Sequence, residues 1–360
     1  MMRVEMPPEL ETEIFRCFRC GFCRSACPTF IVMGSESWGA RGRLILARSV
    51  LEGQAEPTPD LLDRIFSCTS CLACETVCPA VVRIVDALEA FKEALISAGV
   101  RPPPRIAELA RRLSELGNPL AREARGFEAR GSGGDILVFT GCVASELEQG
   151  VVRALEKVLD RAGVSYSVLE GPCCGAPFAR MGLRAEARRA ARRLEEKIRS
   201  SGAQTVITPC PFCLEALSGL GLRAQHTTTF LAGLLRSGRL EVRAPVELKA
   251  TYHDPCVLGR RLGIYDAPRE ILWASGLTLV EMERAKRSSF CCGHGLLAFE
   301  AYPELAQEMA DERVREAMGT GADVLVTACP ACLHGLKGAV KRVARGLAVS
   351  DVVEVLAEVV

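Results

Sequence analysis

Cysteine is the residue type in this chain that points most directly to chemistry. The 360 residues include eighteen cysteines, which fall into four groups with the spacing of metal ligands and leave no thiol over. Thiolates spaced in this way hold iron–sulfur clusters. The cysteines therefore predict a protein that transfers electrons.

The first two groups share the spacing C-x2-C-x2-C-x3-C-P, and their members are Cys17, Cys20, Cys23, Cys27 and Cys68, Cys71, Cys74, Cys78. This is the spacing of bacterial ferredoxins, in which the fourth cysteine of each run binds the cluster of the other run. Three thiolates on a tight turn cover three irons of a cube, so the fourth must come from elsewhere. We therefore predict two cubane 4Fe–4S clusters, one held by Cys17, Cys20, Cys23 and Cys78 and one held by Cys68, Cys71, Cys74 and Cys27.

Zinc and disulfide bonds are the other common uses of closely spaced cysteines. Structural zinc usually takes separated pairs of ligands rather than one compact run ending in proline. Disulfides are typical of secreted proteins, whereas residues 1–10 lack the apolar stretch of a secretory signal. We therefore expect iron–sulfur clusters in a cytoplasmic protein.

The later two groups are five-cysteine sets, each with an adjacent pair followed by glycine. The first set is Cys142, Cys173, Cys174, Cys210 and Cys213. The second set is Cys256, Cys291, Cys292, Cys329 and Cys332. Five thiols are one more than a tetrahedral zinc ion binds, whereas an adjacent pair can place two sulfurs on neighbouring irons.

Two histidines lie beside the second set. His253 comes three residues before Cys256, and His294 follows the Cys292-Gly293 pair directly. Each is a candidate catalytic proton donor to a product thiolate. The alternative is a hydrogen bond to a loop or to a cluster sulfur.

Composition and periodicity divide the chain into four parts, namely an all-α domain at 1–98, a linker at 99–134, a first α/β domain at 135–244 and a second at 245–360. The predicted fold class is therefore multidomain, with an N-terminal all-α, ferredoxin-like domain for two 4Fe–4S clusters and then a duplicated α/β, Rossmann-like unit. In each α/β half the cysteines follow strand ends, where such folds build ligand sites.

The individual elements follow from the spacing of apolar residues. Helices are expected at 42–51, 81–96, 105–116, 146–162, 184–200, 229–236, 303–318 and 351–359. Strands are expected at 135–140, 165–169, 205–208, 248–252, 278–280 and 323–327. The glycine-rich stretch 126–134 is expected to be flexible.

At this point the residues resemble a known family. The repeated CCG sets, together with Tyr252-His253-Asp254-Pro255-Cys256, resemble the cysteine-rich domain of heterodisulfide reductases. The stretches at 41–43 and 67–71 resemble the iron–sulfur domain that is fused to it in the D-type chains of that family. Similar chains are iron–sulfur subunits of glycolate- and lactate-oxidising complexes.

The resemblance implies cofactors and an activity. Each complete five-cysteine set would bind one noncubane 4Fe–4S cluster, and a disulfide would be reduced to two thiols between these two clusters, or formed in the reverse direction. The ten cysteines of the sets would then be catalytic, and the two cubane clusters would supply electrons. The alternative is an electron-transfer subunit of a flavin-dependent glycolate or lactate dehydrogenase complex, with no substrate site of its own.

Partners and location follow from what the sequence lacks. No G-x-G-x-x-G follows a strand, so electrons should come from a partner, either a flavoprotein or a membrane cytochrome b-type subunit that binds to the all-α domain. The net charge of +1 gives no reason to expect nucleic acid. No apolar run approaches the roughly 18–20 residues that span a bilayer. Any attachment to the cytoplasmic face of the membrane should therefore be peripheral, through a partner.

Overall fold

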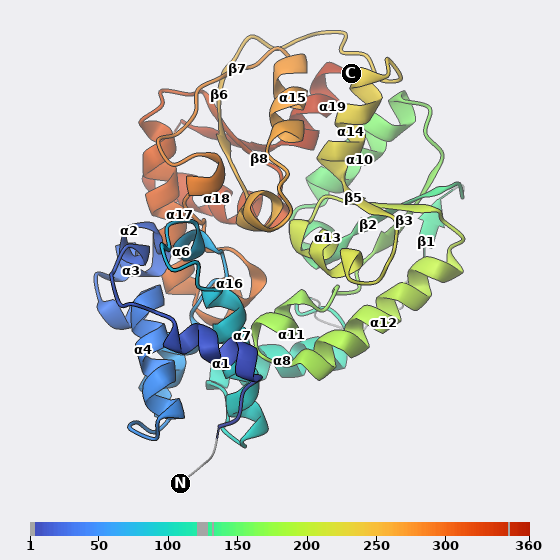
Figure 1. Ribbon diagram of the computed structural model, residues 1–360. Coiled ribbons are helices and arrows are strands. Elements are labelled where there is room, and N and C mark those ends of the chain that lie inside the picture. Colours follow the sequence, from blue (N-terminus) through green and yellow to red (C-terminus); the bar gives the residue numbers. More distant parts are fainter. Residues whose placement is uncertain (1–3, 121–128, 132, 345) are drawn as a thin grey trace.

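The computed structural model describes residues 4–120, 129–131, 133–344 and 346–360. A helical N-terminal part lies against two α/β halves, each with its own sheet (Figure 1). The first and the last helix of the chain lie on opposite sides of the molecule (Figure 1).

The helical part consists of α1 (Pro8–Phe15), α2 (Cys23–Ala26), α3 (Pro28–Met33), η1 (Glu36–Trp38), α4 (Ala40–Leu51), α5 (Pro59–Phe66), α6 (Ala73–Thr76), α7 (Ile84–Ser97) and α8 (Pro104–Leu116). Proline occupies the first turn of α3 and α5, where its missing N–H leaves no helical hydrogen bond unmade. Leu44 of α4, Ile65 of α5 and Phe91 of α7 are buried in a core that also contains cysteines of both runs.

The first α/β half is built on a five-stranded sheet with the order β1-β3-β2-β4-β5. Its strands are β1 (Ala129–Gly131), β2 (Ile136–Thr140), β3 (Tyr166–Glu170), β4 (Thr205–Thr208) and β5 (Ala224–His226). Its helices are α9 (Gly141–Glu146), α10 (Gln149–Arg161), α11 (Ala176–Arg180), α12 (Arg184–Ser200), α13 (Pro211–Ser218) and α14 (Thr227–Arg236). All pairings are parallel except that of β1 with β3.

The second half repeats this plan on a four-stranded parallel sheet with the order β7-β6-β8-β9. Its strands are β6 (Lys249–His253), β7 (Thr278–Leu279), β8 (Val324–Thr327) and β9 (Ala348–Asp351). Its helical segments are η2 (Val257–Arg261), α15 (Asp266–Ala274), η3 (Lys286–Ser288), α16 (Leu296–Ala301), α17 (Pro303–Met318), α18 (Pro330–Val343) and α19 (Val352–Val359).

The two halves share one hydrophobic core. Val138 of β2 and Leu155 of α10 belong to the same buried cluster as Tyr252 of β6 and Leu356 of α19. The central strands are buried along most of their length, as expected for parallel strands covered on both faces. This shared core brings the cysteine-bearing loops of the two halves together.

The expected elements agree with the structure for most of the chain, with one clear error. The composition of 126–134 predicts a flexible segment, but Ala129–Gly131 forms edge strand β1, held antiparallel by the backbone of β3. Residues 126–128 and 132 lie outside the described residues. The sequence patterns also give no sign of the two edge strands β5 and β9. Within the described part of the chain, no helix is both long and apolar enough to cross a membrane.

Candidate iron–sulfur centres

The two N-terminal cysteine runs form two separate thiol-lined cavities. The outer cavity is lined by Cys17, Cys20, Cys23 and Cys78. The inner cavity is lined by Cys27, Cys68, Cys71 and Cys74. Each cavity therefore takes three thiols from one run and one from the other, which is the division expected when ferredoxin runs exchange their fourth ligand. This geometry supports the ligand assignment, which stays a prediction.

A tight loop shapes the outer cavity. Arg19 and Gly21 both have positive φ, at 57° and 90°. Arg41 fastens the loop by donating from Nη1 to the carbonyl oxygen of Arg19 at 2.9 Å. A side chain on Gly21 would meet that guanidinium at 2.9 Å, so the loop requires glycine there. Cys20 is exposed, and it places the outer cavity at the surface of the molecule.

Two buried cations, Arg43 and Lys92, lie at or near the inner cavity. Arg43 lines it and donates to Thr29 Oγ1 at 2.9 Å and to Ser67 Oγ at 3.0 Å. Lys92 is fully buried and donates to the carbonyl oxygen of Arg180 at 3.1 Å. Burial lowers the pKa of Lys92, while the nearby Cys68 favours its charged form. Positive charge at this position would stabilise a group of thiolates or an anionic cluster.

The first five-cysteine set is gathered where three neighbouring strands end. Cys142 follows β2, the adjacent pair follows β3, and the last two cysteines flank the start of α13 after β4. All five line one cavity, together with Cys68 of the inner group and Ala331 of the second half. Gly141 allows this packing, because a Cβ there would lie only 2.7 Å from the Cys213 sulfur.

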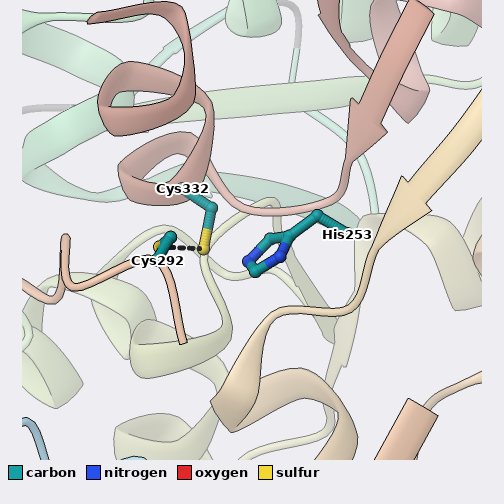
Figure 2. Close-up of side chains that lie close together, drawn as sticks. All are labelled: His253, Cys292 and Cys332. Carbon is teal, nitrogen blue, oxygen red and sulfur yellow. Dashed lines mark hydrogen bonds between the residues drawn. The ribbon is translucent and has the colours of Figure 1, made fainter. Parts of the chain in front are cut away.

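The second set has the same arrangement at the ends of β6, β7 and β8. The sulfurs of Cys292 and Cys332 lie 3.3 Å apart (Figure 2). Cys291 is in contact with Cys256 and Cys292 of its own set and with Cys71 of the inner group. Gly293 has a φ of 77°, and a Cβ there would meet the backbone of Ala306 at 3.0 Å, which parallels the close packing of Gly175 in the first half.

The second cysteine of each adjacent pair is the more acidic one. Hydrogen bonds from Cys173 and Cys213 lower the pKa of Cys174 well below its ordinary value. Hydrogen bonds from Cys291 and Cys332 do the same for the pKa of Cys292. Thiolate is the form that binds metal, so each half holds its adjacent pair ready for ligation in the same way.

The four groups form a continuous path. Burial, and then the charge of Cys27 from the inner group and those of the outer thiols Cys17 and Cys20, raise the pKa of Cys23 to about 11, so the outer and inner groups are close. A hydrogen bond with Cys291 lowers the pKa of Cys71 to about 5 and joins the inner group to the second set. The hydrogen bond with Cys332 acts to lower the pKa of Cys329, but burial and then the charge of Cys210 in the first set raise it. The two five-cysteine sets therefore lie near each other.

The two candidate histidines have different surroundings. A ring nitrogen of His253 lies with the sulfurs of Cys292 and Cys332 in a group whose atoms are within 4.8 Å of one another (Figure 2). His294 instead donates from Nδ1 to the carbonyl oxygen of Cys292 at 2.9 Å. Burial lowers the pKa of His294, so its ring is neutral and its Nε2 is an acceptor. This geometry fits the alternative, loop-binding role for His294.

Several buried or half-buried cations near the sites carry no signal in the sequence. Arg260 donates to the carbonyl oxygen of Cys71 at 2.6 Å, and Arg313 donates to the His253 ring at 3.0 Å. Arg180 lines the cavity of the first set between Glu89 and Glu215. Charged residues on helices and in turns ordinarily face water, so sequence reasoning missed all three.

The donor set fits iron–sulfur clusters. All eighteen cysteines are free, and they form two groups of four and two groups of five with little exposed sulfur. Cysteine thiolates are the ligands of such clusters, and buried cations nearby offset their negative charge. The residues present would therefore hold iron and sulfide at all four places.

Comparison with known proteins also indicates iron–sulfur clusters. The model of a 4Fe-4S dicluster domain matches residues 13–82, and that of a cysteine-rich domain matches twice, at 136–218 and 250–337. The chain is 30% identical to the D-type chain of the dihydromethanophenazine:CoB–CoM heterodisulfide reductase of Methanosarcina barkeri, over 96% of this chain and 94% of that protein. It is 29% identical to a probable membrane-anchored ferredoxin of Chromohalobacter salexigens, over 95% of this chain and 59% of that protein.

A solved structure has a similar fold. The crystal structure of a hypothetical protein from Helicobacter pylori superposes with a TM-score of 0.65 and 11% identity, over 89% of this chain and 67% of that chain. At this identity the likeness shows the fold alone. Taken with the relative that matches along nearly its whole length, it leads to one conclusion: the chain belongs to the family of iron–sulfur oxidoreductase subunits that contains the D-type chains of heterodisulfide reductases.

Proposed function

We propose that the chain reduces a disulfide to two thiols, or forms the disulfide in reverse, between its two five-cysteine sets. The observation that carries the proposal is that both sets are complete and lie close together. Ala331, next but one to Cys329, lines the cavity of the first set, and Cys210 lies near enough to Cys329 for its charge to act on that thiol. A subunit that only relayed electrons would have no need for two such sites side by side.

The reaction requires two electrons and two protons. The S–S bond breaks, each sulfur gains one electron, and each product leaves as a thiol. When bound, noncubane clusters supply single electrons and iron positions that accept thiolates. The ten cysteines of the two sets would hold these clusters, five for each, and each product sulfur would then have its own site.

The cavity of the first set, which reaches the second half, suits the central part of a disulfide. It is lined by apolar groups from both halves, including Val143, Phe212 and Ala298. Such a lining excludes water and favours the uncharged S–S group over free thiolates. Arg180 is the charged residue of the lining, and both terminal nitrogens of its guanidinium are engaged by Glu89 and Glu215 at 2.7 and 2.6 Å.

Electrons would enter through the outer group and pass through the inner group. Cys20 is exposed there, and the side chains of Phe18 and Phe22 are 75% and 62% exposed. Exposed aromatic residues beside a redox centre are typical of a surface that binds a partner. We propose that this surface binds a flavoprotein or a membrane cytochrome b-type subunit, on the cytoplasmic side of the membrane.

The docking surface can be tested with photoreduced flavodoxin as the donor. Changing both Phe18→Ser and Phe22→Ser should slow the reduction of the clusters about tenfold, since apolar contact area at the outer group is lost. Reduction by dithionite, which needs no docking, should not change. Trp273→Ser, which removes an aromatic side chain that is 60% exposed on α15, is the control.

A thiol titration tests the proposed reaction. Excess product thiol added to the oxidised protein should yield a new paramagnetic signal from a five-cysteine set, measured by electron paramagnetic resonance. The alternative is a pure electron relay within a dehydrogenase complex, which the likeness to a probable membrane-anchored ferredoxin favours. An unchanged spectrum in the presence of thiol would support that relay instead.

A further inference from the structure

We infer that His253 and Arg313 make the second five-cysteine set easier to reduce than the first. His253 would donate a hydrogen bond to the sulfurs of Cys292 and Cys332, and Arg313 would position it for this role. The inference rests on the proposed function in one respect, namely that the second set holds a cluster.

His253 is placed by the fold directly at these sulfurs. It is the last residue of β6 and is fully buried. Figure 2 shows its ring turned towards Cys292 and Cys332, and a ring nitrogen and the two sulfurs lie within 4.8 Å of one another. The parallel sheet fixes the backbone, because His253 pairs with Thr327 of β8.

Arg313 determines which ring nitrogen carries the proton. Its Nε donates to Nδ1 of His253 at 3.0 Å. An arginine N–H can only donate, so Nδ1 must accept, and the single proton of the neutral ring lies on Nε2. Among the described residues Nε2 is buried without a hydrogen-bond partner. The N–H that remains is therefore available to the cysteine sulfurs.

Arg313 is itself held from several sides. It is fully buried in α17, and its Nη1 donates to Glu316 Oε2 at 2.6 Å and to the carbonyl oxygen of Arg284 at 2.9 Å. Its Nη2 donates to Ser289 Oγ at 3.3 Å. With these partners the guanidinium cannot rotate away, and the imidazole keeps one orientation and one tautomer. Arg313 is thus a positioning residue.

The first half has no such donor at the corresponding place. The residue three positions before Cys142 is Phe139. Like His253, it lies in a central strand and is fully buried. A phenyl ring cannot donate a hydrogen bond to sulfur. Hydrogen bonds to the sulfurs of a cluster stabilise its more negative, reduced form and raise the reduction potential. Electrons arriving from the inner group through Cys71 and Cys291 would therefore collect first in the second half.

The test is a redox titration followed by electron paramagnetic resonance in a Cys174→Ser background, where the second set supplies the one remaining five-cysteine signal. His253→Phe copies the first half. This variant should lower the ratio of reduced to oxidised cluster about tenfold at a fixed potential. For a one-electron couple, this equals a fall of about 59 mV in the reduction potential of the second set. Arg313→Gln should lower the potential by a smaller amount, because the ring remains but is no longer held.

Two further variants keep the test decisive. His253→Gln retains an N–H donor, so the reduction potential of the second set should stay close to that of the unaltered protein. This variant also tests the inference if His253→Phe fails to bind its cluster. Arg315→Gln removes a half-exposed guanidinium from the same helix, whose ion pair is with Glu312 and not with a partner of Arg313, and should leave the potential unchanged. The cubane signals should be the same in all variants.

The failures can be told apart. A second-set signal whose potential is unmoved by His253→Phe would overturn the inference and leave the proposed function intact. The same holds if His253→Gln behaves like His253→Phe. A Cys174→Ser protein that contains only the iron of the two cubane clusters would overturn both.

Discussion

The two α/β halves carry the same cysteine pattern in different surroundings. In the first half, α12 buries only Leu194 and Ile198 and turns its many arginines to solvent. In the second half, the corresponding helix α17 has buried residues along its whole length and packs against α3 of the helical part (Figure 1). The two halves thus have the same cysteine ligands but different helical surroundings. The first half faces solvent, and the second half faces the helical part with the two N-terminal cysteine runs.

The outward-facing half also has openings that reach its cysteines. One cavity of about 200 Å³ is lined by Cys173 and by Arg189 and Arg193 of α12. Another of about 310 Å³, on the other side of α12, is lined by Cys174 and Ala191. We expect the substrate to reach the first set from this side, while electrons reach the second set from within.

The largest expected effect comes from removing one thiol from each adjacent pair. Cys174→Ser and Cys292→Ser should each abolish disulfide reduction, a loss of at least about a thousandfold, since both product sulfurs need a site. Measured cubane signals should persist in both variants and serve as the internal control. Turnover retained in either variant would show that the two halves do not act together.

A smaller effect tests whether the first half is the open one. Ala191→Trp should fill the larger cavity beside Cys174 and lower turnover about tenfold, because the substrate's approach is obstructed. Arg192→Trp, one residue along the same helix and outside the residues lining both cavities, is the control. Equal rates for the two variants in a steady-state assay would place the entrance elsewhere.

The smallest effect concerns the buried caps of two corresponding helices. His226 caps α14, and burial lowers its pKa from 6.5 to about 4. Asp351 caps α19, and burial raises its pKa from 3.8 to about 8. Between about pH 4 and 6.5 the unfolded chain binds more protons at His226 and the folded chain binds more at Asp351. The two contributions to the pH dependence of stability therefore oppose each other.

Single variants should expose each contribution. Asp351→Asn should leave the free energy of unfolding rising from about pH 4 to 6.5, because His226 alone then acts. His226→Asn should leave it falling from about pH 4 to 8, because the folded-state proton of Asp351 is progressively lost. Each slope should approach about 1.4 kcal/mol per pH unit. Denaturant unfolding of the anaerobic protein measures both, and curves parallel to that of the unaltered chain would contradict the assignment.

Much of this fold could be predicted because its main elements have strong local patterns. The helices at 184–200 and 303–318 and the strand at 205–208 have the predicted bounds, since their apolar residues repeat clearly. The edge strands β5 and β9 could not be predicted. Each is short and partly polar, and it is extended because the neighbouring strand supplies hydrogen-bond partners.

In the candidate site, too, one part could be predicted from the sequence and another part could not. Cysteine spacing identifies the four groups because the ligands of one centre lie in a few short stretches. Lys92 and Arg313 carry no such signal, since each lies on a helix with other charged residues and becomes buried only through packing of distant segments. Which half has a donor beside its sulfurs likewise depends on the meeting of β6 with α17.

The mixed origin of the thiols around the outer and inner cavities has a consequence for biogenesis. Each cavity takes one of its four thiols from the other cysteine run. The ligand set of either cavity is therefore incomplete until both runs have folded. Loading of iron into the helical part should be all-or-none, and damage to one centre by oxygen should release the other.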